Sequence, residues 1–216
     1  MKKIEIKEFG GPEVLEIKNV DIGKPGQNEV LVKNLSIGIN YIDTYHRSGL
    51  YPIPLPSGIG LEACSIIEEV GSEVKLFKVG DRVTRASMPI GTYSEKQIIP
   101  EDKLVKVPDN ISDEVASCIT LKGITAEYLL HRTYQVKKGD KILYHAAAGA
   151  LGQIFCPWAN ALGAEIIGTV GSDEKIEIAK KNGCHHVINY NEKNFVEEVE
   201  KIVGKNGLDV VYDGVG

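Results

Sequence analysis

From about residue 140 onward, short apolar strands alternate with stretches of helical spacing, and this alternation constrains the fold more than any other feature. The predicted strands are 141–145, 165–170, 186–189 and 208–212. The intervals between them, beginning with 151–162, have the apolar spacing of helices. Three strand–helix units and a further strand predict a parallel, doubly wound sheet with right-handed crossovers. A complete sheet of this kind has about six strands in two halves, so we expect the first half and one strand of the second.

The part of the chain before this alternation reads as strands and turns. Residues 3–7 and 29–33 alternate with a period of two, and each is bounded by Gly or Pro. Residues 51–58 contain three prolines, which exclude a helix there. We therefore predict an all-β, barrel-like domain over residues 1–120, followed by the α/β domain over residues 121–216.

Two local signals concern helices. Ser112, followed by Asp113 and Glu114, is typical of a helix start, and residues 123–133 are expected to form a second helical stretch. Pro157 lies inside the helix expected over 151–162. Because proline removes one main-chain hydrogen bond, we expect a local bend in that helix.

Charge and cysteine usage limit the classes of function. Thirty acidic residues against 25 basic ones give a net charge of −5, which opposes a broad contact with nucleic acid. No apolar run approaches the roughly 18 residues of a membrane span. The four cysteines, Cys64, Cys118, Cys156 and Cys184, form no Cys-x-x-Cys pair and read as buried thiols in a reducing compartment. We expect a soluble, cytoplasmic protein with no metal site and no nucleic-acid or membrane partner.

The strongest local motif is the run from His145 to Gly152, His-Ala-Ala-Ala-Gly-Ala-Leu-Gly. It follows an apolar strand and precedes a helix, which is the context that a nucleotide-binding loop requires. Small residues let the main chain approach a pyrophosphate, and the helix N-terminus presents unpaired N–H groups to it. The motif lacks one glycine of the full pattern, so an incidental turn is the alternative. The repeated strand–helix units favour nucleotide binding.

The end of the second predicted strand bears on the choice of cofactor. An NAD site places an acidic residue there to bind the ribose 2′-hydroxyl, whereas this strand ends without a carboxylate. Ser172 and Lys175 follow it, and both suit a 2′-phosphate. Asp173 and Glu174 would repel that phosphate if they turned inward, or they are simply acids in the first turn of the next helix. We expect NADPH rather than NADH.

Many spaced segments together resemble one family. They are 40–52 (Asn-Tyr-Ile-Asp-Thr-Tyr-His-Arg-Ser-Gly-Leu-Tyr-Pro), 58–63, 79–83, 121–125, 139–140, 146–152, 158–164, 168–171 and 187–190. The sequence resembles the zinc-free quinone oxidoreductases, relatives of zeta-crystallin in the medium-chain dehydrogenase/reductase superfamily. The resemblance implies a GroES-like β-barrel domain followed by a Rossmann-type sheet. It also implies that NADPH and a quinone or enone are bound in the cleft between these domains.

The family's Rossmann domain continues through two further strands. By this resemblance we expect the chain to be truncated and its sheet to be incomplete at the C-terminus. The expected partners are a small-molecule quinone or enone, and either a second copy of the chain or a missing C-terminal part. Zinc-dependent relatives carry Gly-His-Glu where this chain has Gly60-Leu61-Glu62, so the resemblance implies a metal-free site.

The resemblance also assigns roles to residues. Asn40 and Tyr45 match the polar groups beside the nicotinamide and the substrate carbonyl, and we expect both to be catalytic. The expected cofactor-binding residues are Asn40, Thr125, Ala148, Gly149, Ala150, Leu151, Gly171, Ser172, Lys175 and Tyr190. For three of them a structural role is the alternative: packing for Tyr45 and Tyr190, and capping of a turn for Asn40.

The activity expected from these assignments is hydride transfer from the nicotinamide to a quinone or enone held by Tyr45 and Asn40. Without a metal, hydrogen-bond donors must stabilise the negative charge that develops on the substrate oxygen. Two alternatives stay open: a 2-alkenal or enone reductase, and a nucleotide-binding fragment that does not turn over. RNA binding has little support, because the chain is acidic and its Lys and Arg are not clustered.

Overall fold

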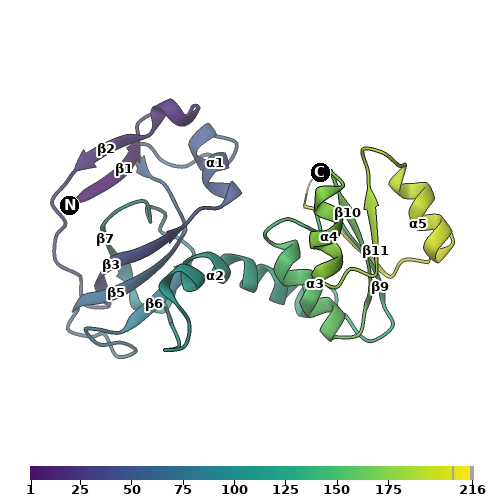
Figure 1. The fold of residues 1–216 in the computed structure, drawn as a ribbon. Coiled ribbons are helices and arrows are strands. Elements are labelled where there is room, and N and C mark those ends of the chain that lie inside the picture. Colours follow the sequence, from purple (N-terminus) through teal and green to yellow (C-terminus); the bar gives the residue numbers. More distant parts are fainter. Residues whose placement is uncertain (206, 215–216) are drawn as a thin grey trace. The chain divides into compact units, whose positions relative to one another are not determined.

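The computed structural model describes residues 1–205 and 207–214; positions 206, 215 and 216 of the predicted second domain lie outside the described residues. It divides into two compact units, residues 1–121 and 122–216 (Figure 1). Within the described residues, no helix has both the length and the apolar character needed to cross a membrane.

The first unit is built on two antiparallel sheets. A five-stranded sheet has the order β7-β3-β5-β6-β8, and a three-stranded sheet has the order β2-β1-β4. Val30, Val32, Ile67, Val83 and Ile99 pack together as the core of the larger sheet. The strands are β1 (Lys2–Ile6), β2 (Glu16–Asn19), β3 (Glu29–Gly38), β4 (Ser57–Gly58), β5 (Glu62–Val70), β6 (Arg82–Ala86), β7 (Lys96–Pro100) and β8 (Val105–Lys106), with short 3-10 turns η1 (Pro12–Val14) and η2 (Glu101–Lys103).

An α-helix interrupts these strands, so the expectation of an all-β first half is wrong at this point. Helix α1 covers Tyr41–Ser48. Asn40 is its N-cap residue, and Asp43 Oδ2 accepts a hydrogen bond from the Asn40 main-chain N–H at 2.9 Å. Gly49 ends the helix with a φ of 82°, a conformation that glycine adopts without strain. The capping residues at both ends of α1 are a sequence signal for a helix, which was overlooked because strands lie on either side of it.

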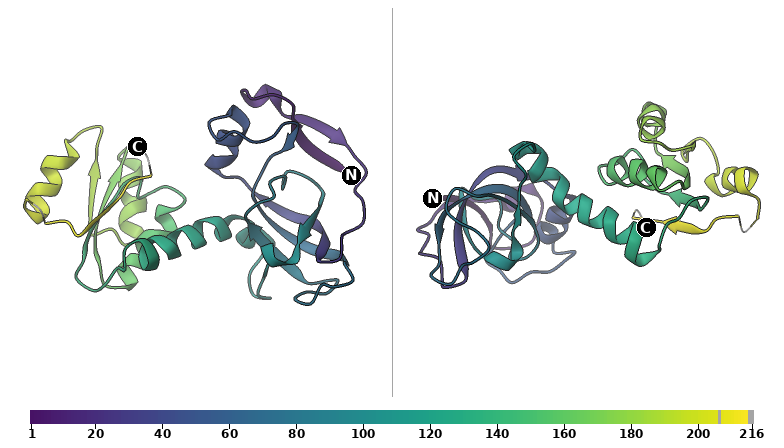
Figure 2. Two further views of the ribbon diagram at one scale, coloured as in Figure 1. Left: turned by 180° about the vertical axis from the view of Figure 1, so that it is seen from behind. Right: turned by 90° about the horizontal axis from the view of Figure 1, so that it is seen from below.

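The two helical stretches predicted around residues 112–133 are one continuous helix. Helix α2 covers Asp113–Tyr128 and passes into a π-helical turn, η3 (Leu129–Thr133). Ser112 Oγ accepts a hydrogen bond from the Val115 main-chain N–H at 3.3 Å, so the predicted start is confirmed. Figure 2 shows α2 as one continuous helical ribbon, and Gly123 lies within its bounds. A single helical glycine costs only about 1 kcal/mol relative to alanine, so the helix can continue through it.

The second unit contains the predicted parallel sheet. Its four strands have the order β11-β10-β9-β12, and every pairing is parallel. This is the order 3-2-1-4 expected for the first half of a doubly wound sheet plus one strand. The strands are β9 (Lys141–Tyr144), β10 (Glu165–Val170), β11 (His186–Asn189) and β12 (Val210–Tyr212), and the helices are α3 (Gly152–Ala161), α4 (Glu174–Lys181) and α5 (Phe195–Val203).

Helices cover both faces of this sheet (Figure 1). Phe155 of α3 packs in one apolar cluster with Tyr144 and Ala179, on the face that α3 and α4 cover. Val199 of α5 packs with Leu143 and other residues on the opposite face. Adjacent residues of β9 thus enter different cores, as the alternation of strand side chains requires. Helix α3 runs through Pro157 without interruption, and the bend expected there stays a prediction.

Candidate functional site

The loop between β9 and α3 presents main-chain donors at the carboxyl end of the sheet. Two of its N–H groups are used internally: that of Ala147 donates to Thr169 O at 3.0 Å, and that of Gly149 donates to Ala146 O at 2.8 Å. The N–H groups of Ala148, Ala150, Leu151 and Gly152 have no acceptor within residues 1–205 and 207–214. Together with the positive end of α3, these donors suit an anion.

Gly152 makes this loop possible. A Cβ at Gly152 would lie 2.4 Å from Ala147 O and 2.7 Å from the carbonyl carbon of Ala147, and neither main-chain atom can move aside cheaply. Ala147 is itself fully buried. The first turn of α3 therefore packs directly against the loop.

The ends of β10 and β11 form a second candidate region. Tyr190 follows β11, and its hydroxyl lies 2.6 Å from the point that a Cβ on Gly171 would occupy. Asn191 Nδ2 donates to Gly171 O at 2.7 Å. Ser172 is half-buried beside them, and Lys175 is exposed in the first turn of α4. Within this unit, the structure brings together the four residues expected around the adenosine ribose.

The two acidic residues between Ser172 and Lys175 have different surroundings. Asp173 Oδ1 accepts a hydrogen bond from Asn189 Nδ2 at 2.9 Å, which ties its carboxylate to the end of β11. Glu174 is exposed in the first turn of α4. Both positions agree with acids that favour a helix N-terminus, the structural alternative considered above.

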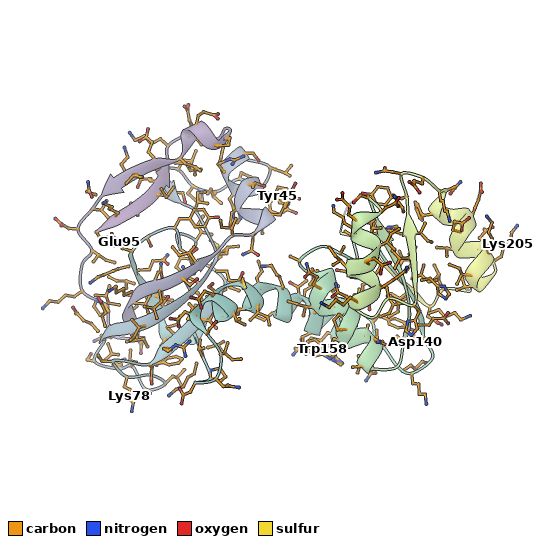
Figure 3. The ribbon with its side chains drawn as sticks, viewed as in Figure 1. Tyr45, Lys78, Glu95, Asp140, Trp158 and Lys205 are labelled. Carbon is orange, nitrogen blue, oxygen red and sulfur yellow. The ribbon has the colours of Figure 1, made fainter. Side chains whose placement is uncertain are left out.

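In the first unit, Asn40 is the N-cap residue of α1 and Tyr45 lies within the same helix. Tyr45 is half-buried and makes edge contacts with the rings of Tyr41 and Tyr51, with centroid distances of 5.8 and 5.3 Å. Figure 3 shows its side chain extending from α1. Its hydroxyl makes no hydrogen bond to any described residue. Thr125, the remaining predicted cofactor contact, is half-buried on α2.

Two buried carboxylates around Asn40 were missed by the sequence reasoning. Glu62 Oε2 accepts from Asn40 Nδ2 at 2.8 Å, so one donor of the carboxamide proposed for the substrate is engaged by Glu62. Asp43 is only 3% exposed, and its Oδ2 accepts from both the Asn40 main chain and the Tyr93 hydroxyl. Burial raises the pKa of Asp43, while its hydrogen bonds oppose that shift. The capping pattern from Asn40 to Asp43 was the available signal; Glu62 had none beyond its place in the Gly60-Leu61-Glu62 segment.

Comparison with known proteins places the chain in a family. Residues 26–109 match the family model "Alcohol dehydrogenase GroES-like domain", and residues 150–216 match "Zinc-binding dehydrogenase". The chain is 49% identical over 216 residues to a quinone oxidoreductase of Pseudomonas aeruginosa, and 48% identical over 218 residues to a 2-haloacrylate reductase of a Burkholderia species. It covers 66% and 65% of these relatives, and they cover 100% and 98% of it.

A solved structure agrees with this comparison. The crystal structure of Escherichia coli quinone oxidoreductase complexed with NADPH matches 100% of this chain and 67% of its own, at 49% identity and a TM-score of 0.97. The GroES-like domain and the Rossmann-type sheet inferred from the sequence are confirmed by these matches. The chain spans about two thirds of the length of the relatives that it matches.

The zinc implied by the name of one family model does not fit the residues present. No group of three or more His, Cys, Asp or Glu side chains in the described part of the chain could hold a metal ion. Leu61, which cannot ligate a metal, precedes Glu62 where a histidine ligand would be needed. The loop between β9 and α3, by contrast, fits a dinucleotide. The chain belongs to the quinone oxidoreductase family of the medium-chain dehydrogenase/reductase superfamily.

Proposed function

We propose that this chain carries the NADPH site and part of the substrate site of an NADPH-dependent quinone reductase. The observation that carries this proposal is the set of four main-chain N–H groups, at Ala148 and from Ala150 to Gly152, that have no acceptor in the described chain. Buried or helix-terminal donors are normally satisfied, so a row of open ones at the end of a parallel sheet suits a pyrophosphate. The solved relative from Escherichia coli is complexed with NADPH.

The choice of NADPH over NADH rests on the ends of β10 and β11. Ser172 and Lys175 supply a hydroxyl and a cation, and Tyr190 adds a phenol above Gly171. These are donors for a 2′-phosphate, whereas an acid pointing toward the ribose would favour NADH. Asp173 is proposed not to take that role, because its Oδ1 already accepts a hydrogen bond from Asn189. Thr125 is proposed to contact the nicotinamide end of the cofactor.

The proposed chemistry on the substrate side uses Asn40 and Tyr45. When bound, NADPH supplies the hydride. The Tyr45 hydroxyl, which is not engaged elsewhere in the described chain, is proposed to donate to the substrate oxygen as negative charge develops on it. Asn40 is proposed to orient the nicotinamide and the substrate carbonyl. Electron-poor acceptors need little acid assistance, so a quinone suits a site without a strong acid.

A second candidate is reduction of an electron-poor alkene. It is favoured by the 48% identity to a 2-haloacrylate reductase, which is nearly as high as the identity to a quinone oxidoreductase. Both reactions deliver a hydride to an electron-poor carbon or carbonyl system, so the same donors would serve. Activity with different acceptors distinguishes the two candidate reactions. One assay uses a benzoquinone, and the other uses a 2-haloacrylate or an alkenal.

The test follows absorbance at 340 nm with purified protein, NADPH and each acceptor in turn. Oxidation of NADPH with the quinone supports quinone reduction, and oxidation only with the alkene supports the second candidate. NADPH binding without oxidation of NADPH by either acceptor would overturn both candidates and leave a nucleotide-binding chain. Tyr45→Phe should lower kcat about 10- to 100-fold, at or below the low end of general acid catalysis, because electron-poor acceptors need little acid assistance.

Three further assignments belong to the proposal. Residues 1–120 are proposed to form the substrate side and residues 121–216 the NADPH-binding domain. The protein is proposed to work in the cytoplasm, which suits its four free cysteines. The outer edge of β12 is proposed to be covered either by a second copy or by further chain, because exposed strand edges invite pairing.

A further inference from the structure

Asn40 is held at two points by two different buried carboxylates. Its main-chain N–H donates to Asp43 Oδ2 at 2.9 Å, and its side-chain Nδ2 donates to Glu62 Oε2 at 2.8 Å. Asp43 and Glu62 are 3% and 0% exposed. Two buried acids around one amide are costly unless hydrogen bonds to their oxygens compensate, so this arrangement calls for a reason.

Glu62 uses both of its oxygens as acceptors. Oε2 accepts from Asn40, and Oε1 accepts from the main-chain N–H of Leu121 at 2.7 Å, in the middle of α2. Glu62 is fully buried, and a Cβ at Gly38 would lie 2.9 Å from its Oε2, so the carboxylate occupies space that only a glycine at position 38 leaves open. The side chain thus joins the N-cap of α1 to α2 through one fixed carboxylate.

The acceptor oxygens of Glu62 determine which end of the Asn40 carboxamide faces it. Because Glu62 Oε2 accepts the hydrogen bond, the amide turns its NH₂ group toward Glu62 and its carbonyl oxygen away. We propose that Glu62 is a positioning residue that sets the orientation of the Asn40 carboxamide in the substrate site. This inference rests on the proposed function for its catalytic consequence, but the orientation itself can be tested without turnover.

Replacing Glu62 by glutamine changes hydrogen bonding with little change in shape. Glutamine has one acceptor and one donor at the end of its side chain, whereas Asn40 and Leu121 both present donors. If the glutamine oxygen serves Leu121, its NH₂ group faces the NH₂ group of Asn40, and the Asn40 amide is driven to flip. Glu62→Gln is therefore expected to reverse the Asn40 carboxamide while leaving α2 bonded.

Asp43 provides an informative contrast. Its Oδ2 accepts both of its hydrogen bonds, from Asn40 and Tyr93, while its Oδ1 is buried without a partner in the described chain. An asparagine with its oxygen at the Oδ2 position keeps both bonds. Asp43→Asn is thus expected to leave the orientation of the Asn40 carboxamide unchanged. Glu69→Gln, an exposed position on the same strand as Glu62, is the matched control.

The experiment records the side-chain amide resonances of ¹⁵N-labelled protein, with the Asn40 pair assigned by its loss in Asn40→Ala. We expect the Asn40 pair to shift and to exchange faster with solvent in Glu62→Gln, and to match wild type in Asp43→Asn and Glu69→Gln. In parallel, kcat with a quinone is expected to fall about 10- to 100-fold in Glu62→Gln, with KM for NADPH within about twofold of wild type. An Asn40 pair unchanged by Glu62→Gln overturns the proposal.

Two outcomes separate this inference from a purely structural role. Asn40→Asp combined with Glu62→Gln also pairs a donor with an acceptor at this contact, so it should keep the midpoint of thermal unfolding close to that of Glu62→Gln without restoring kcat. A loss of kcat in Glu62→Gln that merely follows a lower midpoint, with a parallel rise in KM for NADPH, overturns the positioning role. If the wild-type chain oxidises no NADPH, the proposed function fails, and the Asn40 resonances alone still decide the orientation.

Discussion

The phenol oxygen of Tyr190 lies 2.6 Å from the position that a Cβ on Gly171 would take. This relationship joins the ends of two neighbouring parallel strands, β10 and β11, at the edge where ligands bind in sheets of this class. Because the contact involves the far end of a flexible side chain, an added methyl group would displace the phenol rather than the main chain. A side chain added at Gly171 should therefore disturb the proposed ribose site through Tyr190.

Gly171→Ala is expected to weaken NADPH binding about tenfold, equivalent to about 1.4 kcal/mol, because Tyr190 must leave its place above the strand end. The free energy of unfolding should change little, since no left-handed conformation is needed at Gly171. A fluorescence titration with NADPH measures the first effect, and urea unfolding measures the second. Gly23→Ala, which meets no atom within 4 Å, is the control. Equal NADPH affinity in both variants would count against the role of Tyr190.

Lys175→Ala is expected to weaken NADPH binding about 10- to 100-fold and to leave NADH binding unchanged, because the ammonium group is proposed to bind only the 2′-phosphate. Titrations with both cofactors check this. Lys181→Ala removes an equally exposed charge from the last turn of the same helix and should affect neither cofactor. If Lys175→Ala weakens both cofactors equally, the 2′-phosphate role is refuted.

Gly152→Ala is expected to lower the free energy of unfolding by about 1–3 kcal/mol, because the new Cβ would lie 2.4 Å from a main-chain oxygen that cannot yield. Gly123→Ala should do the opposite. It lies in α2 with nothing within 4 Å of its added Cβ, so the methyl group should stabilise the helix by about 0.5–1 kcal/mol. Urea unfolding of the two variants tests both signs, and the same sign in both would contradict the packing argument.

The buried thiol of Cys64 is expected to make stability fall at alkaline pH. Burial raises the pKa of Cys64 to about 11, with a smaller contribution from the hydrogen bond to Asp113. The pKa of a cysteine in the unfolded chain is about 8.5. The folded state therefore holds this proton more tightly. Its contribution is complete below the unfolded pKa and is lost as the pH rises through the folded one.

Urea unfolding at several pH values between 8 and about 11 measures this loss. Relative to Cys64→Ala, the wild type should lose up to about 1.4 kcal/mol per pH unit across that window. Cys118→Ala removes an exposed thiol and should follow the wild type. Identical pH dependence in wild type and Cys64→Ala would show that the Cys64 thiol is not protected by folding.

The second unit was predictable because its strands and helices repeat a local pattern. The strand at 165–170 and the strand at 186–189 coincide with β10 and β11 at both ends. Most residues in the middle of these strands are buried and apolar, and the helices between them have an apolar face, so the local pattern indicates both.

The first unit was harder for a physical reason. Helix α1 is only eight residues long and carries few apolar residues, so periodicity could not reveal it. The network around Asn40 depends on Glu62 and Leu121, which lie 22 and 81 residues away along the chain. Such long-range bonds leave no local signal. The resemblance to a family pointed to Asn40, and the capping pattern could have indicated Asp43, but the contact with Glu62 is evident only in the structure.

Main-chain donors of the loop between β9 and α3 are proposed to bind the pyrophosphate of NADPH. The most direct measurement is an NADPH titration of the ¹⁵N-labelled chain, followed through its main-chain amide resonances. We predict saturable shifts that are largest at Ala148, Ala150, Leu151 and Gly152, with smaller shifts at Ala147 and Gly149, whose N–H groups are already bonded. Saturating NADPH that leaves these four amides unmoved would contradict the account.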